Sequence, residues 1–155
     1  MPDINPQDFI DELRFDIKTK DKIKAHLVLK HFDEVDEQTQ KMAILELNRA
    51  ENTFVIPVLV DLIATDYRWS DEPADLKELL FAKTLAAPEV LTQLLIRENK
   101  PNNRALLAEI AGEIRLESAV PILLGILNEE TNESVLCGAI NAIGTIGDPS
   151  ATSTL

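Results

Sequence analysis

A repeat of 32 residues constrains the fold of this chain more than any other feature of its sequence. Evenly spaced leucines mark the period: Leu59, Leu91, Leu123 and Leu155. Pro57 and Pro121 lie two such steps apart and have similar apolar neighbours. A fixed period of this length is the signature of stacked supersecondary units, in which each unit buries its apolar face against the next.

Each unit is predicted to be a pair of helices, because apolar residues recur at positions i, i+3 and i+4. The expected helices are residues 6–17, 20–32, 37–50, 54–66, 73–86, 88–98, 102–114, 118–129 and 133–145. Pro57 and Pro121 are expected in first helical turns, where backbone N–H groups have no intrahelical acceptor. Ser118 is a candidate N-cap. The sequence has no alternating strand pattern, so the predicted fold class is all-α.

The helix pairs predict a single continuous domain of repeated units. The repeats are expected at about 36–66, 71–99, 101–130 and 132–155, the last one incomplete. Residues 1–35 follow the period less closely and are predicted to form a degenerate N-terminal helix pair or a polar cap. Because the period predicts a helix that continues past residue 155, we expect the chain to be an N-terminal fragment of a longer protein.

The charge of the chain excludes several classes of partner. Its formal net charge is −12, whereas a protein that grips nucleic acid or an anionic membrane neutralises phosphates with lysine and arginine. We therefore expect no nucleic acid and no membrane among its partners. The start of the sequence shows no signal-peptide pattern and no apolar run is long enough to span a bilayer, so we expect a cytoplasmic protein.

The residues that most often carry chemistry are sparse. His26 and His31 are five apart and do not share the helical face that a zinc-binding pair needs. The single cysteine, Cys137, cannot form an internal disulfide, and the period aligns it with Ala105, which predicts a small buried position. The acidic run 33–37 lacks the spacing and glycine of a calcium loop and is interpreted as a helix start. We predict no catalytic residue, no cofactor and no metal site.

Two segments resemble a known repeat family. The stretch from Ala111 to Leu124, with Gly112 and Pro121, and the segment from Ala142 to Ala151, with its Gly-Asp-Pro, are similar to HEAT repeats, in particular the bacterial HEAT-like class of phycobilisome lyases. The resemblance implies a right-handed α-solenoid of antiparallel helix pairs, HEAT/armadillo-like. It also implies a protein-binding module, of a kind that occurs joined to bacterial signalling domains.

In such a stack the second helix of each pair usually lines the concave face, where partners bind. Columns of positions related by the period are candidate contacts there, namely Val60, Thr92 and Leu124, then Asp61 and Gln93, then Ala64, Ile96 and Asn128. The alternative is that the apolar members are buried between adjacent units. Tyr67 and Trp69, on a link between helices, are either binding anchors or cover for a less regular repeat.

The sequence thus predicts a non-catalytic scaffold that binds a partner protein, or a domain of its own parent chain, through the concave face. The alternative is a subunit of a bilin or cofactor lyase of the HEAT type. A further expectation concerns the last repeat, whose incomplete stack would expose Ala139, Ile143 and Ile146. That exposure would allow self-association through the open C-terminal repeat.

Overall fold

The computed structural model of the chain describes residues 5–65 and 74–147. These residues form helices and connecting turns, with no strand among them, and the all-α fold class is confirmed. The chain divides into two compact units, Met1–Lys83 and Thr84–Leu155. Each unit is built from helix pairs, as the period predicts, while the right-handed twist and the single continuous domain stay predictions.

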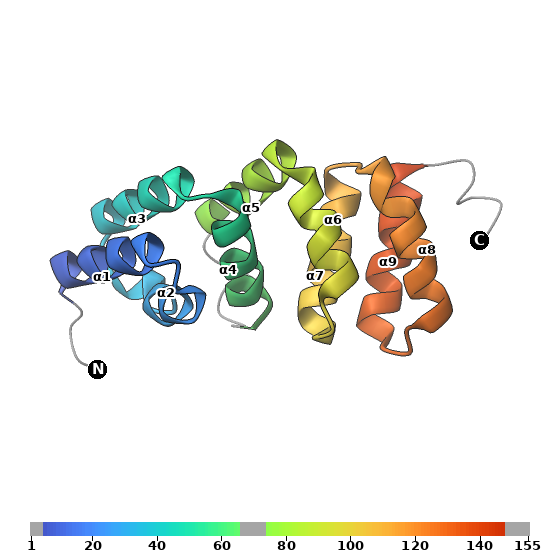
Figure 1. The fold of residues 1–155 in the computed structure, drawn as a ribbon, viewed down its shortest axis with the longest axis horizontal. Helices are drawn as coiled ribbons and strands as arrows, with labels where there is room; N and C mark the ends of the chain where they lie inside the picture. The colour runs from blue at the N-terminus through green and yellow to red at the C-terminus, as the bar shows by residue number, and fades with distance from the viewer. Residues whose placement is uncertain (1–4, 66–73, 148–155) are drawn as a thin grey trace. The chain divides into compact units, whose positions relative to one another are not determined.

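The first unit contains two helix pairs joined by a short 3-10 helix (Figure 1). The first pair is α1 (Pro6–Lys18) with α2 (Lys22–Leu29), and the second is α3 (Glu37–Arg49) with α4 (Asn52–Thr65). The 3-10 helix η1 (Phe32–Glu34) connects them, and α5 (Ala74–Ala86) continues into the second unit. Because α1 packs on α3 and α2 packs on α4, first helices and second helices form separate layers.

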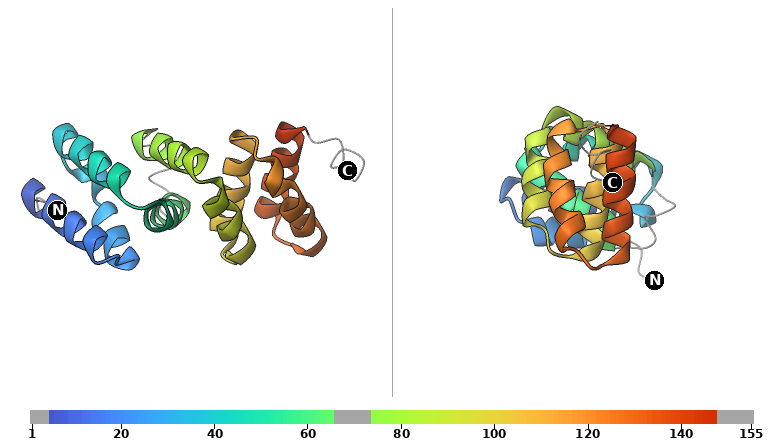
Figure 2. Two further views of the ribbon diagram at one scale, coloured as in Figure 1. Left: turned by 45° about the horizontal axis from the view of Figure 1, so that its top comes forward. Right: turned by 90° about the vertical axis from the view of Figure 1, so that its right-hand side faces the viewer.

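The second unit repeats this arrangement. Its elements are α6 (Pro88–Arg97), α7 (Pro101–Glu113), η3 (Glu117–Ala119), α8 (Val120–Glu129) and α9 (Glu133–Ile146). The helix α7 packs on α9, and α6 packs on α8. The right-hand view of Figure 2 shows α6 and α8 in one layer and α7 and α9 in the other. The layer of α6 and α8 therefore corresponds to the second helices of the predicted repeats.

Four helix starts have the side-chain N-caps that are preferred at this position. Asn5, Asp21, Asp36 and Asn132 are N-caps whose side chains accept hydrogen bonds from the first turns of α1, α2, α3 and α9. The side chain and backbone N–H of Thr39 donate to Asp36 and hold the pKa of its carboxyl below the usual value. The acidic run 33–37 is thus confirmed as a helix start.

Two predicted helix starts are wrong. Ser118 is not an N-cap, because it lies inside η3 and the chain enters α8 through that 3-10 turn, with Ala119 at the cap position and no side-chain cap. Pro57 does not lie in a first turn, because α4 begins at Asn52 and encloses the proline. Pro121, by contrast, is in the first turn of α8, where proline is well tolerated.

Two first helices, α1 in the first unit and α7 in the second, end in the same type of turn. Lys20 and Arg115 adopt the left-handed conformation, with φ of 58° and 53°, just after α1 and α7. The next backbone N–H then reaches back across the last helical turn, from Asp21 to the Asp16 carbonyl and from Leu116 to the Ala111 carbonyl. This is a Schellman motif, which satisfies carbonyls that the helix leaves without a donor.

Candidate functional site

The candidate contact residues in the second unit lie on α6 and α8. On α6, Thr92 and Ile96 are one turn apart and Gln93 is beside them, so the three side chains share one face. Ile96 is 64% exposed, Gln93 is exposed, and Thr92 is half-buried with its hydroxyl donating to the Glu89 carbonyl at 3.0 Å. The helix therefore presents one large apolar side chain within a polar border.

The neighbouring helix α8 adds two residues to this face. Leu124 is half-buried and Asn128, one turn later, is exposed. Because α6 packs on α8 within the same unit, these residues and those of α6 lie on one layer. We call this set the second-helix surface, and it consists of Thr92, Gln93, Ile96, Leu124 and Asn128.

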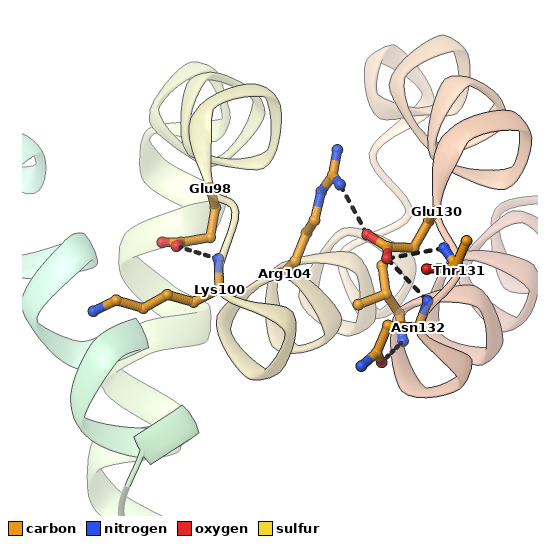
Figure 3. Close-up of polar contacts among 7 residues, drawn as sticks. Glu98, Lys100, Arg104, Glu130, Thr131 and Asn132 are labelled. Atoms are coloured by element: carbon orange, nitrogen blue, oxygen red, sulfur yellow. Dashed lines mark hydrogen bonds and ion pairs between the residues drawn. The ribbon is translucent and has the colours of Figure 1, made fainter.

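A repeated polar turn fixes the C-terminal ends of both helices that carry this surface (Figure 3). Glu98 ends α6, and its carboxylate accepts the backbone N–H of Lys100 at 3.0 Å. Glu130 ends α8 one period later, and its carboxylate accepts the backbone N–H of Asn132 at 2.9 Å. Ile96 and Asn128 each lie two residues before one of these glutamates, so they occupy equivalent positions relative to the turns.

The second of these turns is tied to the adjacent first helix. The Arg104 guanidinium on α7 donates to Glu130 at 2.9 Å, and both side chains are mostly buried. The backbone N–H groups of Asn132 and Thr131 together with Arg104 hold the pKa of Glu130 below its usual value, with the Asn132 bond the largest cause. The carboxylate is therefore kept ionised. Its charge-assisted bond with Arg104 ties the turn between α8 and α9 to α7.

The candidate residues in the first unit lie on α4 and are less accessible. Val60 is only 2% exposed and belongs to the core of this unit, so for this position the alternative of burial between helices holds. Asp61 is partly exposed and its carboxylate lies 2.9 Å from Nδ1 of His26 on α2, while Ala64 is half-buried. The His26–Asp61 pair joins the second helices of the two pairs, and His26 is a structural residue here.

The aromatic link cannot be placed. Tyr67 and Trp69 lie outside the described residues, so their role stays a prediction.

Two expectations for the last described helix are wrong. Ala139 and Ile143 are buried and Ile146 is half-buried, because their side of α9 packs on α7 and α8. Cys137 is exposed where burial was expected. It lines a groove between α7 and α9. Ala105, the residue that the period aligns with Cys137, is instead in close contact with the neighbouring Gly138.

Sequence reasoning missed a groove on the first helix pair. It encloses about 540 Å³ between α1 and α2. The lining residues are Asp11, Glu12, Phe15 and Asp16 of α1 and Lys24, Leu27 and Val28 of α2. We call it the end groove. The only signal in the sequence is that Phe15 and Leu27 do not fit the buried stripe of their helices, and both are more than half exposed.

Among residues 5–65 and 74–147 no group of three or more histidine, cysteine, aspartate or glutamate side chains is arranged to hold a metal ion. In the same segments no single helix is long and apolar enough to cross a membrane, although one bent pair of consecutive helices, α5 with α6, passes by length and composition.

Comparison with known proteins identifies the repeat. Residues 88–155 match the family model of HEAT repeats, which covers nearly all of the second unit. Neither the curated proteins nor the solved structures give a match. HEAT repeats commonly serve as scaffolds for protein interaction and are typically non-catalytic. The phycobilisome-lyase subtype stays a prediction from the resemblance alone.

Proposed function

HEAT repeats make up residues 88–155, and from that premise we propose that the chain is a non-catalytic scaffold that binds a partner protein, or a domain of its own parent chain, through the second-helix surface. Binding would rest on shape and surface matching, with no bond chemistry. The bilin-lyase alternative rests only on family resemblance.

The observation that carries this proposal is the environment of Ile96. Its side chain is 64% exposed, although isoleucine is among the residues most often buried. Polar side chains from Gln93 and Asn128 lie on the same layer, and half-buried Leu124 adds apolar area. An apolar centre with a polar border is the usual anatomy of a protein interface.

The experiment compares two isoleucines in the same unit. Ile96→Glu places a charge at the centre of the second-helix surface, while Ile140→Glu places one on α9, where Ile140 is 46% exposed. Each variant is immobilised and used to capture partners from the source cell, and the captured protein is then purified and titrated. Ile96→Glu is expected to weaken binding at least tenfold, because a charge at the centre of an interface is desolvated without a partner.

The two variants share an added charge, and both are expected to keep the helicity of the parent chain. Weakened binding in Ile140→Glu with none in Ile96→Glu would move the interface to the first helices and contradict the proposal. The surface is not tested with Val60→Glu, because that buried residue would carry the charge into the core.

A further inference from the structure

The end groove contains the carboxylate of a residue that is mostly buried. Asp16 is only 4% exposed, yet no described backbone or side-chain donor bonds its carboxylate. The neighbouring Asp21 carboxylate is already used as the N-cap of α2, where it accepts the Lys24 backbone N–H at 3.0 Å. The carboxylate oxygens are not fully shielded from solvent, so a donor that enters the groove can reach them.

Burial also acts on the pKa of this group. Desolvation is the largest cause that raises the pKa of Asp16, and the nearby Asp21 and Glu12 carboxylates add to it, while Lys24 opposes them. The surroundings therefore disfavour the negative charge, and a cation delivered to the groove would remove that penalty.

The rest of the groove suits an apolar side chain. Phe15 on α1 and Leu27 on α2 are 60% and 54% exposed and line the same groove as Asp16. Ile23, one turn before Leu27 on α2, is 76% exposed and extends the apolar area. Such neighbours on two packed helices form the kind of surface into which an amphipathic helix docks.

The charges that line the groove favour a positively charged occupant. Asp11, Glu12 and Asp16 provide three carboxylates, and Lys24 is the single cation among the lining residues. A second copy of this chain would bring a net charge of −12 to an acidic surface, which opposes self-docking. A basic segment is attracted by the same charges.

We propose that the end groove binds an amphipathic helical segment of a partner protein, with one arginine paired to Asp16 and a large apolar side chain against Phe15 and Leu27. Arginine fits better than lysine because its planar fork can bond a carboxylate through two donors and is less costly to desolvate. This groove shares no residue with the second-helix surface, so it is a second binding site beyond the proposed function.

The probe is a fluorescein-labelled synthetic helix of about four turns. It carries two leucines and one arginine on one face, with alanine and glutamine elsewhere. A second probe replaces the arginine by citrulline, which keeps the shape and removes the charge. Fluorescence anisotropy then measures the affinity of each probe for the intact chain and its variants.

Two variants test the two halves of the groove. Asp16→Asn is expected to weaken binding of the arginine probe about tenfold and to leave the citrulline probe unchanged. Phe15→Ser is expected to weaken both probes about tenfold, because it removes apolar contact area that both use. Phe15 is exposed, so this variant folds even if Asp16→Asn does not.

Glu89→Gln is the matched control, since it removes the same charge from an exposed position on α6. It is expected to bind both probes as the parent chain does. Equal affinity of the parent chain and Asp16→Asn for the arginine probe would overturn the proposal, as would no binding of that probe at about 1 mM. A dimer by light scattering that Phe15→Ser dissociates would identify a second copy as the occupant and would also overturn it. None of these outcomes affects the comparison of Ile96→Glu with Ile140→Glu.

Discussion

The two units build the same helix-pair architecture from different residues. All five phenylalanines, with the single tyrosine and tryptophan, belong to the first unit, and all five glycines belong to the second. In the first unit, Phe9, Phe32 and Phe54 fill the space between helices and are nearly fully buried. In the second, the helices approach closely because small residues face each other.

The close approach in the second unit has an atomic cause. A Cβ built on Gly112 of α7 would lie 2.7 Å from the Ala142 Cα of α9, and one built on Gly138 would lie 3.2 Å from the Ala105 carbonyl oxygen. In the first unit, α1 and α3 are joined instead by Arg14 and Glu46, whose side chains meet at 3.0 Å one period apart. The comparison teaches that the period specifies the fold while the packing residues vary, and the HEAT-repeat match falls on the small-residue version.

The largest effect is expected from Phe32→Ala in the first unit. Phe32 is completely buried in η1, between the two helix pairs. Its truncation removes apolar contacts and leaves a cavity, which costs about 3–5 kcal/mol of unfolding free energy. Urea denaturation followed by circular dichroism measures the change. A loss below about 1 kcal/mol would show that aromatic packing does not support this unit.

The next largest effect is expected from Gly112→Ala in the second unit. The added methyl group meets the backbone of α9, which cannot yield as a side chain would, so we expect a loss of about 1–3 kcal/mol. Gly125→Ala on α8 is the matched control. Its Cβ would meet nothing within 4 Å, and this variant is expected to gain about 0.5–1 kcal/mol from helix propensity. Equal stabilities of the two variants would refute the close-packing account.

A smaller effect, a gain in stability, is expected in both units at the turns after α1 and α7. Lys20→Gly and Arg115→Gly relieve a left-handed conformation that costs a non-glycine residue about 1–2 kcal/mol, although glycine also loses more entropy on folding. Gly147 already occupies the position one period after Arg115, with φ of 74°. Both variants should therefore unfold at slightly higher temperature. A lower unfolding temperature for either would show that the lysine or arginine side chain contributes more than the strain costs.

The smallest effects distinguish the units by their response to pH. The pKa of Asp16 is raised, so its protonated form stabilises the folded state, and this contribution is fully present below about pH 3.8. The contribution is lost as the pH rises through the raised pKa. The pKa of Glu130 is lowered, so its ionised form stabilises the fold above about pH 4.5 and this stability is lost as the pH falls through the lowered value. Thermal unfolding across this range reports both.

At neutral pH, Asp16→Asn is expected to raise the unfolding temperature and Glu130→Gln to lower it. Both differences should shrink as the solution is acidified, because the parent chain then carries neutral carboxyls at the same positions. Changes of equal sign in the two variants would contradict the assignment of opposite environments to these residues.

The period and the apolar stripe were sufficient to predict the helices. Every described α-helix was expected within a few residues, because regularly spaced apolar positions mark the face that a helix buries. The two 3-10 helices were not predicted. Exposure at single positions was harder to predict. Val60 was a candidate contact and is buried, because α4 buries consecutive residues, Val58 to Val60 among them, and so has more than one buried face.

The end groove shows where sequence reasoning stops. Asp16 lies on α1 among exposed acidic residues, and its burial depends on how α2 folds back across it. A one-dimensional pattern records the charge of Asp16 and not its environment. The same limit explains Cys137, whose exposure follows from Gly138 taking the close contact next to it.

The repeated glutamate turn makes the chain modular in an evolutionary sense. Glu98 and Glu130 adopt similar backbone conformations, and each caps the N–H two residues ahead. A recombination event that deletes residues 99–130 would place Thr131 and Asn132 directly after Glu98, which recreates the Glu-Thr-Asn turn already present at the second joint. A duplication of the same block would leave both joints as they are. Genes that encode such a turn can therefore gain or lose whole repeats without new mutations at the seams.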